Sequence, residues 1–506
     1  MSSFRLRASP AFIIVAMIPT WLALMDVTIL NVGYDDIAAS LGATLDEVSW
    51  ASTAYTLAGI TMLPLAGWLV SRFGRRRVFV TMLSLFALGS LLCGLATSAT
   101  ELAAFRLFQG LGGGLMGTVS QAILIDAYPD EYRTDAISLL SVLAIIGPIL
   151  GPVVAGFVLV HFAWPMLFFI NLPLAIFTIW LCFGIDIEQK AKTPPARFSF
   201  TTLALLFGTL FCFQFVLQSG QRLDWFDSAA IRWSLVSAVI LGALLVFQQM
   251  RLAKPMIDLR LFANREFLVG NVLSIVAGGS NYAISFIGPL FLQQILGFSP
   301  LETGLLTIPS ALALLVGNRV QDYLVRRVPL YVLLPPGMFA LAVALWYNGV
   351  YADMNDLRSI MLLRLLQGFA FGVFIVPIGI FAFKTIAKKD IDSASGLFAL
   401  VRQESGMIGI AAVAALVEGA QTGYFRRLLL QVPRWPVLTH HAAASQAAVV
   451  AAVSHRANVL AYQHVYAVSA AVMFGVALLI ALYGLYDWLV HSGANGTTAA
   501  AAAPHA

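Results

Sequence analysis

Arg106-Leu107-Phe108-Gln109-Gly110 and Arg364-Leu365-Leu366-Gln367-Gly368 are two copies of one short phrase, 258 residues apart in this chain. Gly114 recurs at the same offset as Gly372. Each copy stands in a long apolar run, where an arginine is costly and usually functional. The offset is about half of the 506 residues. The repeat therefore predicts a duplicated membrane protein with the organisation of a transporter.

The composition excludes a soluble globular protein. The chain is 60% hydrophobic and 11% charged, whereas a soluble domain carries about 25% charged residues. The three cysteines, Cys93, Cys182 and Cys212, all lie in apolar runs and form no Cys-x-x-Cys pair. A disulfide framework or a zinc site is therefore not expected, and the cysteines are interpreted as small packing residues.

Fourteen segments are apolar and long enough to cross a bilayer. They are 11–32, 47–70, 78–98, 102–126, 136–160, 164–184, 199–218, 230–248, 267–292, 303–323, 329–350, 359–383, 394–418 and 465–489. With the N-terminus in the cytoplasm, this map puts all six lysines and most arginines on the cytoplasmic side. That asymmetry follows the positive-inside rule. We therefore expect a multi-pass protein of the cell membrane with both termini in the cytoplasm.

The predicted fold class is all-α, a polytopic membrane protein with 14 transmembrane helices arranged 6 + 2 + 6. Residues 1–185 form an N-terminal six-helix bundle, and 186–266 form a linker with two extra transmembrane helices. Residues 267–490 form a pseudo-symmetric C-terminal six-helix bundle that includes a long extracytoplasmic loop, 419–464, with an amphipathic helix over 445–462. The tail 491–506 is expected to be disordered.

A glycine- and arginine-rich loop joins the second and third segments. Its key residues are Gly67, Arg72, Gly74, Arg75 and Arg76. Glycines let two helix ends approach closely, and the arginines can bind carboxylates or helix C-termini. The loop resembles the signature loop of the major facilitator superfamily, where it acts as a cytoplasmic gate. The alternative is an ordinary positive-inside anchor.

The fifth segment contains two interleaved rows of small and proline residues. They are Gly147, Pro148, Gly151, Pro152 and Gly156. Small residues four apart allow close helix contact in lipid, and prolines four apart bend a helix. This resembles the antiporter motif of superfamily exporters, which importers of the same fold generally lack. The alternative is helix packing without functional meaning.

The first segment carries the phrase Leu24-Met25-Asp26-Val27-Thr28-Ile29-Leu30-Asn31-Val32. It is similar to the signature of the fourteen-span drug:proton antiporters, the EmrB/QacA type of the major facilitator superfamily. Gly33-Tyr34-Asp35 departs from that signature, so the outer end of this helix is expected to be unusual. The resemblance implies multidrug efflux across the inner membrane, and hence antibiotic resistance. The energy source would be the proton gradient, with no other cofactor. Relatives with a long outer loop work with a periplasmic adaptor and an outer-membrane channel, which are therefore possible partners.

Five ionisable residues lie well inside the predicted spans, where each must be paired or face water. They are Asp26, Arg106, Arg364, Arg402 and Glu404. Our hypothesis is that Asp26 and Arg106 form the proton-coupling centre with Gln109 hydrogen-bonded nearby, because a partner cation and desolvation act in opposite directions on a carboxyl group. A static ion pair is the alternative. Glu404, Arg402 and Arg364 are interpreted as a substrate site or second charge site, or as a structural pair.

Several other functions are excluded or less favoured. No glycine precedes a lysine, so there is no P-loop, and the histidines show no metal-ligand spacing. No set of catalytic groups converges, so the chain is not expected to be an enzyme, and the basic loops are explained by topology without nucleic acid. An apolar cavity with few charges suits a small amphipathic substrate. The alternatives are a dedicated exporter of one metabolite (an aromatic acid, siderophore or antibiotic) and a non-transporting membrane scaffold.

Overall fold

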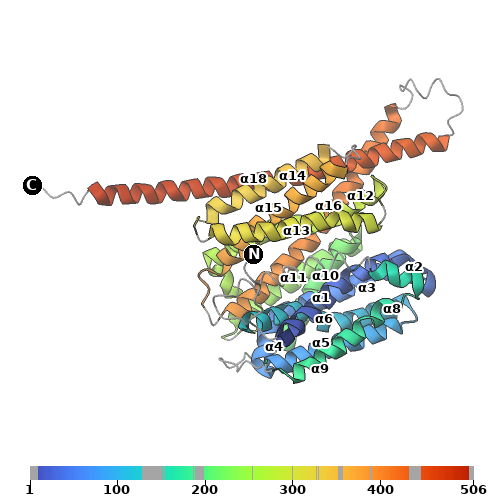
Figure 1. Cartoon of the computed structure of the whole chain (residues 1–506), viewed down its shortest axis with the longest axis horizontal. Helices are drawn as coiled ribbons and strands as arrows, with labels where there is room; N and C mark the ends of the chain where they lie inside the picture. Colours follow the sequence, from blue (N-terminus) through green and yellow to red (C-terminus); the bar gives the residue numbers. More distant parts are fainter. Residues whose placement is uncertain are drawn as a thin grey trace, which may run out of the picture. The chain divides into compact units, whose positions relative to one another are not determined.

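The chain is helical in every regular element that the structure describes (Figure 1). The computed structural model describes residues 10–127, 151, 154–185, 187, 199–253, 255–298, 300–325, 327–328, 330–350, 357–387, 390–431 and 446–500. Its α-helices are α1 (Pro10–Val32), α2 (Tyr34–Leu41), α3 (Leu45–Met62), α4 (Ala66–Phe73), α5 (Arg75–Gly94), α6 (Ala99–Ala127), α8 (Met166–Phe169), α9 (Asn171–Phe183), α10 (Phe200–Ser219), α11 (Ala229–Arg251), α12 (Arg265–Gln294), α13 (Pro300–Val325), α14 (Leu330–Val350), α15 (Leu357–Phe383), α16 (Ile391–Gln431) and α18 (Gln446–Ala500). Short 3-10 turns occupy Leu63–Leu65, Trp225–Asp227 and Leu259–Ala263.

The predicted spans agree with these helices. Every predicted segment except 136–160, most of which lies outside the described residues, coincides with one or two helices. Within the described part of the chain, 11 helical stretches are long and apolar enough to cross a membrane. The all-helical membrane fold is thus confirmed, while the count of fourteen spans stays a prediction.

Two segments near the C-terminus differ from the sequence prediction. α16 continues to Gln431 and α18 begins at Gln446, so much of the predicted loop 419–464 is helix, including the predicted helix over 445–462. α18 also runs to Ala500, through much of the segment 491–506 for which disorder was expected. In 419–431 and 446–464 the physical reason is local composition, because alanine, leucine, glutamine and arginine favour the helix even where a segment is too polar to cross a bilayer. The segment 491–500 contains two glycines, an asparagine and two threonines, so composition does not account for its helix.

The chain packs as two compact units. The first comprises Met1–Gly279 with Ala382–Ala411, and the second comprises Ser280–Phe381 with Ala412–Ala506. The first unit therefore also contains the two extra helices α10 and α11. Since the boundaries of the units pass through α12 and α16, the predicted division at 185 and 266 stays a prediction.

The internal repeat is visible as the same helix contact within each unit. In the first unit, a Cβ added to Gly59 of α3 would stand 3.2 Å from the Cα of Gly114 on α6. In the second, a Cβ added to Gly317 of α13 would stand 3.0 Å from the Cα of Gly372 on α15. Both pairs keep the 258-residue offset of the duplicated phrase. Two helices can approach this closely only where neither carries a side chain.

The glycine- and arginine-rich loop is a one-residue break between two helices. Gly74 has φ +84°, a conformation that suits glycine, and it separates α4 from α5. Arg76 Nη2 donates to the carbonyl oxygen of Phe183 at 2.9 Å, and its guanidinium lies 5.6 Å from the centre of that ring. Phe183 is the last residue of α9. Arg76 therefore binds a helix C-terminus, as the sequence predicted.

Candidate functional site

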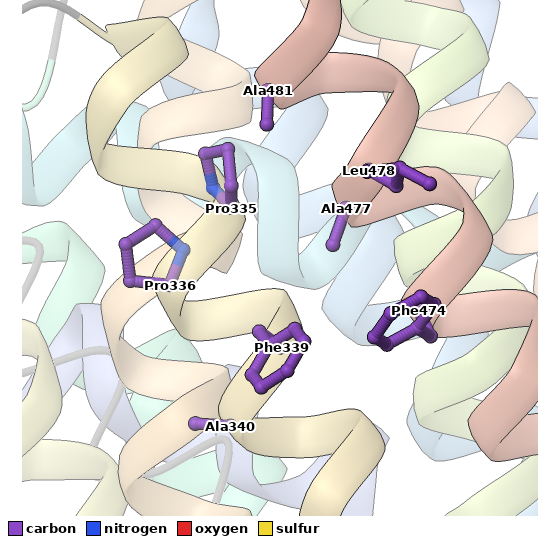
Figure 2. A pocket seen from close by; sticks show the side chains of 8 residues that line it. All are labelled: Pro335, Pro336, Phe339, Ala340, Phe474, Ala477, Leu478 and Ala481. Atoms are coloured by element: carbon purple, nitrogen blue, oxygen red, sulfur yellow. The ribbon is translucent and has the colours of Figure 1, made fainter.

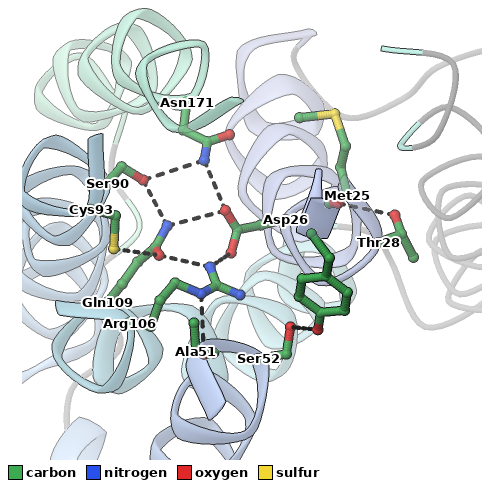
Figure 3. A network of polar contacts seen from close by, with 11 residues as sticks. Met25, Asp26, Thr28, Ala51, Ser52, Ser90, Cys93, Arg106, Gln109 and Asn171 are labelled. Atoms are coloured by element: carbon green, nitrogen blue, oxygen red, sulfur yellow. Dashed lines mark hydrogen bonds and ion pairs between the residues drawn. The ribbon is translucent and has the colours of Figure 1, made fainter. Parts of the chain in front are cut away.

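A fully buried carboxylate, Asp26 on α1, is the centre of a polar network between three helices (Figure 3). Arg106 Nη1 on α6 forms an ion pair with its Oδ2. Gln109 Nε2 donates to Oδ1 at 3.1 Å, and Asn171 Nδ2 on α9 donates to the same oxygen at 3.0 Å. The predicted pairing of Asp26 with Arg106 and Gln109 is confirmed. Three side-chain donors from α6 and α9 thus converge on one carboxylate.

Gln109 uses all four of its hydrogen-bonding positions. Its Oε1 accepts from Arg106 Nη1 at 2.8 Å and from the Cys93 thiol at 3.6 Å. Its Nε2 donates to Ser90 Oγ at 2.7 Å and to Asp26. A fully bonded amide has one stable orientation. Gln109 therefore holds Asp26 and Arg106 in register across α1, α5 and α6.

Arg106 is held by the network and by an aromatic face. Its Nε donates to the backbone oxygen of Ala51 at 3.4 Å, and its guanidinium lies 4.1 Å from the ring centre of Tyr55, both on α3. Cation–π contact stabilises a desolvated guanidinium. Its Nη2, the Asn171 Oδ1 and the Tyr55 hydroxyl are buried without a hydrogen-bond partner. The network is therefore tightly held around Asp26 and incompletely bonded at its edge.

Three members of this network were not predicted from the sequence: Asn171, Ser90 and Cys93. Each is a polar or sulfur-containing residue in an apolar run. Asn171 Nδ2 also donates to Ser90 Oγ at 3.3 Å, which links α9 to α5 behind the ion pair. A search for isolated amides in predicted spans, applied as it was for charges, would have found Asn171. Nothing in the sequence indicates that Cys93 contacts Gln109.

The antiporter motif lies partly in the described chain. Gly147, Pro148 and Pro152 lie outside the described residues. A Cβ on Gly151 would collide with the side chain of Thr28, two residues after Asp26 on α1. Gly156 has no such neighbour within 4 Å. One position of the motif therefore touches the same helix that carries the buried carboxylate.

Glu404 on α16 contacts one of the extra helices. Gln214 Nε2 of α10 donates to its Oε2 at 3.3 Å, while its Oε1 is buried without a hydrogen-bond partner. Beside this contact, the ring centres of Phe215 on α10 and Trp50 on α3 are 5.9 Å apart. Arg402 is exposed, as expected for a residue two positions away on the helix. The second copy of the arginine, Arg364, belongs to the other unit, so its predicted meeting with Glu404 stays a prediction.

An apolar cavity of about 400 Å³ lies between α14 and α18 in the second unit (Figure 2). Its walls include Pro335, Pro336 and Phe339 on α14, facing Phe474 and Leu478 on α18. None of the predicted charged site residues lines it. In the described part of the chain no group of histidine, cysteine and acidic side chains is arranged to bind a metal ion.

The arrangement of helices is that of known transporters. The structure of the human organic anion transporter MFSD10 (TETRAN) superposes with a TM-score of 0.54, at 16% identity, over 92% of this chain and 100% of that one. The nucleoside transporter NupG superposes with a TM-score of 0.54, at 14% identity, over 93% and 98%. A sequence profile of the Major Facilitator Superfamily matches residues 16–410. The chain belongs to the major facilitator superfamily.

Its relatives indicate the branch of the superfamily. The Escherichia coli (strain K12) "Probable multidrug resistance protein EmrY" is 31% identical over 77% of this chain and 76% of its own length. The Haemophilus influenzae "Multidrug export protein EmrB" is 29% identical over 77% of each chain. The Neisseria gonorrhoeae "Fatty acid resistance protein FarB" is 26% identical over 84% of each chain. The predicted resemblance to EmrB-type transporters is confirmed.

Proposed function

We propose that this superfamily transporter exports hydrophobic or amphipathic compounds in exchange for protons, by alternating access across the inner membrane, with both termini in the cytoplasm. The observation that carries the proposal is the fully buried network of Asp26, Arg106, Gln109 and Asn171. A titratable group held by donors from other helices can link its protonation to helix position. No cofactor other than the proton gradient is proposed.

Protonation of Asp26 couples proton binding to helix movement because it changes the contacts of α1 with α6 and α9. An ionised Asp26 binds Arg106 of α6 and Asn171 of α9. When a proton binds, the carboxyl group loses its charge and one acceptor oxygen becomes a donor, which weakens both contacts. α1 then holds α6 and α9 less firmly, and its packing can change. Release of the proton on the other side of the membrane restores the contacts.

The direction of transport is supported by the motif in the fifth segment. Gly151 packs against Thr28, so a shift of α1 at Asp26 acts directly on the helix that bears the exporter pattern. A static ion pair that only fixes helix packing would need no such contact. We therefore favour antiport of the substrate and the proton.

Glu404 is proposed as a substrate or second proton site. Its buried oxygen lacks a hydrogen-bond partner, and Gln214 supplies its one hydrogen bond among the described residues. An unpaired buried carboxylate is costly until a proton or a cation joins it. Replacement by Gln should change substrate range or pH dependence if Glu404 takes part in transport.

Two narrower proposals concern partners and cargo. The helical extensions 419–431 and 446–464 are proposed to bind a periplasmic adaptor that leads to an outer-membrane channel. Co-purification of an adaptor that depends on residues 426–456 would support this. The name of the relative FarB favours a second candidate function, a dedicated exporter of one kind of metabolite.

The test is transport by purified protein in liposomes with an imposed pH gradient. The wild type should move amphipathic compounds against their gradient, and Asp26→Asn should abolish this movement but retain exchange of substrate without a gradient. Glu47→Gln, which changes an exposed carboxylate at the N-terminus of α3, is the control and should transport normally. Full gradient-driven transport by Asp26→Asn would remove Asp26 from the mechanism.

A further inference from the structure

Arg364 on α15 is a buried cation for which the described chain provides no carboxylate. Its side chain is 6% exposed. Nη1 donates to the neutral Oε1 of Gln367 at 3.3 Å, and Nε has no acceptor. A buried carboxylate can take up a proton and become neutral, but a guanidinium stays charged in a protein. The charge of Arg364 must therefore be balanced by a separate anion.

The duplicated phrase provides an internal comparison. In the first unit, Arg106 receives its negative charge from Asp26 on α1. In the second unit, α12 presents Gly288 to the guanidinium, where an added Cβ would stand 2.9 Å from Nη1 and from Nη2 of Arg364. After Glu266 in its first turn, α12 has no acidic residue. The second copy therefore has the arginine but, at the position that corresponds to Asp26, Ile284.

No described acid of this unit forms an ion pair with Arg364, including Glu418 in the part of α16 that belongs to the unit. α14 and α15 contain no aspartate or glutamate. The one acid of α18, Asp487, is about 30 Å along the helix axis from Tyr466 at a rise of about 1.5 Å per residue. α13 has acids only near its ends, Glu302 and Asp322. Arg364 therefore has no ion-pair partner among the described acids of this unit.

A second unpartnered donor lies beside Arg364. Tyr466 on α18 is 2% exposed, and its hydroxyl has no hydrogen-bond partner among the described residues. Its ring packs edge-on against Phe291 of α12, with centres 5.7 Å apart. Phe291 and Gly288 are three residues apart and so lie on one face of α12. That face meets both Arg364 and Tyr466, so the two side chains lie against the same side of α12.

We propose that Arg364 and Tyr466 bind the carboxylate of an anionic amphipathic substrate. The inference rests on the proposed transport function and narrows its substrate class. A guanidinium and a phenolic hydroxyl are both donors to carboxylate oxygens. The apolar body of the substrate would lie against the ring of Phe291, which packs edge-on against Tyr466. Because Gly288 has no side chain, the Arg364 guanidinium can lie directly against α12.

The test is equilibrium binding to the purified full-length protein in a neutral detergent, with naphthoate and its uncharged analogue naphthamide as probes. The wild type should prefer naphthoate. Tyr466→Phe should weaken naphthoate binding about tenfold, the effect of one hydrogen bond to a charged group, and leave naphthamide unchanged. Tyr462→Phe is the matched control one turn away, because its hydroxyl already donates to Gln294 Oε1 at 3.1 Å. It should bind naphthoate like the wild type.

Replacement of Arg364 gives a second, independent measurement. Arg364→Met should abolish the preference for naphthoate without lowering the unfolding temperature, because it removes a buried charge that has no acid partner. Gly288→Ala should weaken naphthoate binding by crowding the guanidinium while keeping its charge. Unchanged naphthoate binding in Tyr466→Phe and Arg364→Met would overturn the proposal, as would an equal loss for both probes.

Competition with a lipid and transport in liposomes show which anion the site binds and which of the two proposals fails. If phosphatidylglycerol displaces naphthoate and naphthoate is not transported in liposomes, the site binds a lipid headgroup and the assignment to substrate is overturned. If naphthoate binds as expected but no compound moves with the pH gradient, the proposed antiport fails while the anion site stands. If neutral amphiphiles move with the gradient but naphthoate binds no better than naphthamide, the anion site alone fails.

Discussion

Removing one member of the Asp26–Arg106 pair should destabilise the protein far more than removing both. Both side chains are fully buried, so a single change leaves an uncompensated charge away from water. Breaking a buried ion pair from one side typically costs about 3–5 kcal/mol. We therefore expect Asp26→Leu and Arg106→Met each to lower the free energy of unfolding by about that amount.

The double variant Asp26→Leu/Arg106→Met removes both charges together. What remains is the loss of acceptors for Gln109 Nε2 and Asn171 Nδ2, which donate to Asp26 Oδ1 at 3.1 and 3.0 Å. Each donor left without its partner costs about 1–3 kcal/mol. Both amides keep Ser90 as an acceptor, so the lower end of that range applies. The double variant should therefore lose about 2 kcal/mol, much less than the sum of the single variants.

The assay is a double-mutant cycle of unfolding in detergent, followed by the loss of helical circular dichroism. We expect a coupling energy of several kcal/mol, whereas independent sites add within about 0.5 kcal/mol. Asp26→Leu combined with Gly117→Ala is the control, since a Cβ on Gly117 meets nothing within 4 Å. Additive effects of Asp26→Leu and Arg106→Met would refute the view that this network links α1 to α6.

Three further predictions concern packing, the extra helices and a helix end. Gly114→Val should prevent the close contact of α3 with α6 and lower the unfolding temperature by several degrees, whereas Gly117→Ala should not; a normal unfolding temperature in Gly114→Val would contradict the contact. Gln214→Leu removes the one hydrogen bond of Glu404 among the described residues and should shift the pH profile of transport without loss of membrane insertion; an unchanged profile would favour a structural role. Thr44→Ala removes the capping hydroxyl of α3, which accepts from the Glu47 N–H at 3.3 Å, and should cost about 1 kcal/mol in an unfolding titration.

Much of the fold could be predicted because the bilayer imposes strong constraints on sequence. The length of an apolar segment and the distribution of lysine and arginine around it locate a transmembrane helix even when the helices that it packs against are unknown. The same reasoning predicted the helix over 445–462 but not those over 419–431 and 491–500, because hydropathy reports the solvent around a helix and does not exclude a helix in water. The extension of α16 beyond its span depends on local helix propensity.

The candidate site was predictable where charge alone is informative. A charged side chain inside a bilayer span is energetically costly unless an opposite charge neutralises it. The pairing of Asp26 with Arg106 could therefore be predicted from their positions in spans of one unit. The roles of Asn171, Ser90 and Cys93 did not follow, because a neutral polar residue in a span has many satisfactory environments. Only the packing of α5, α6 and α9 around α1 brings these side chains to one carboxylate.

The sequence by itself determined that this chain crosses a membrane many times, that it is duplicated, and that each half carries an arginine in an apolar span. These properties follow from the composition and the repeated motif of the sequence, which can be read without knowing which helices are neighbours. Only the tertiary structure decided that Asn171 and Ser90 complete the network around Asp26, and that Arg364 faces a glycine and has no acid partner among the described residues. The reason is that a buried charge is balanced by whatever neighbouring helices bring to it, and helix adjacency arises from long-range packing.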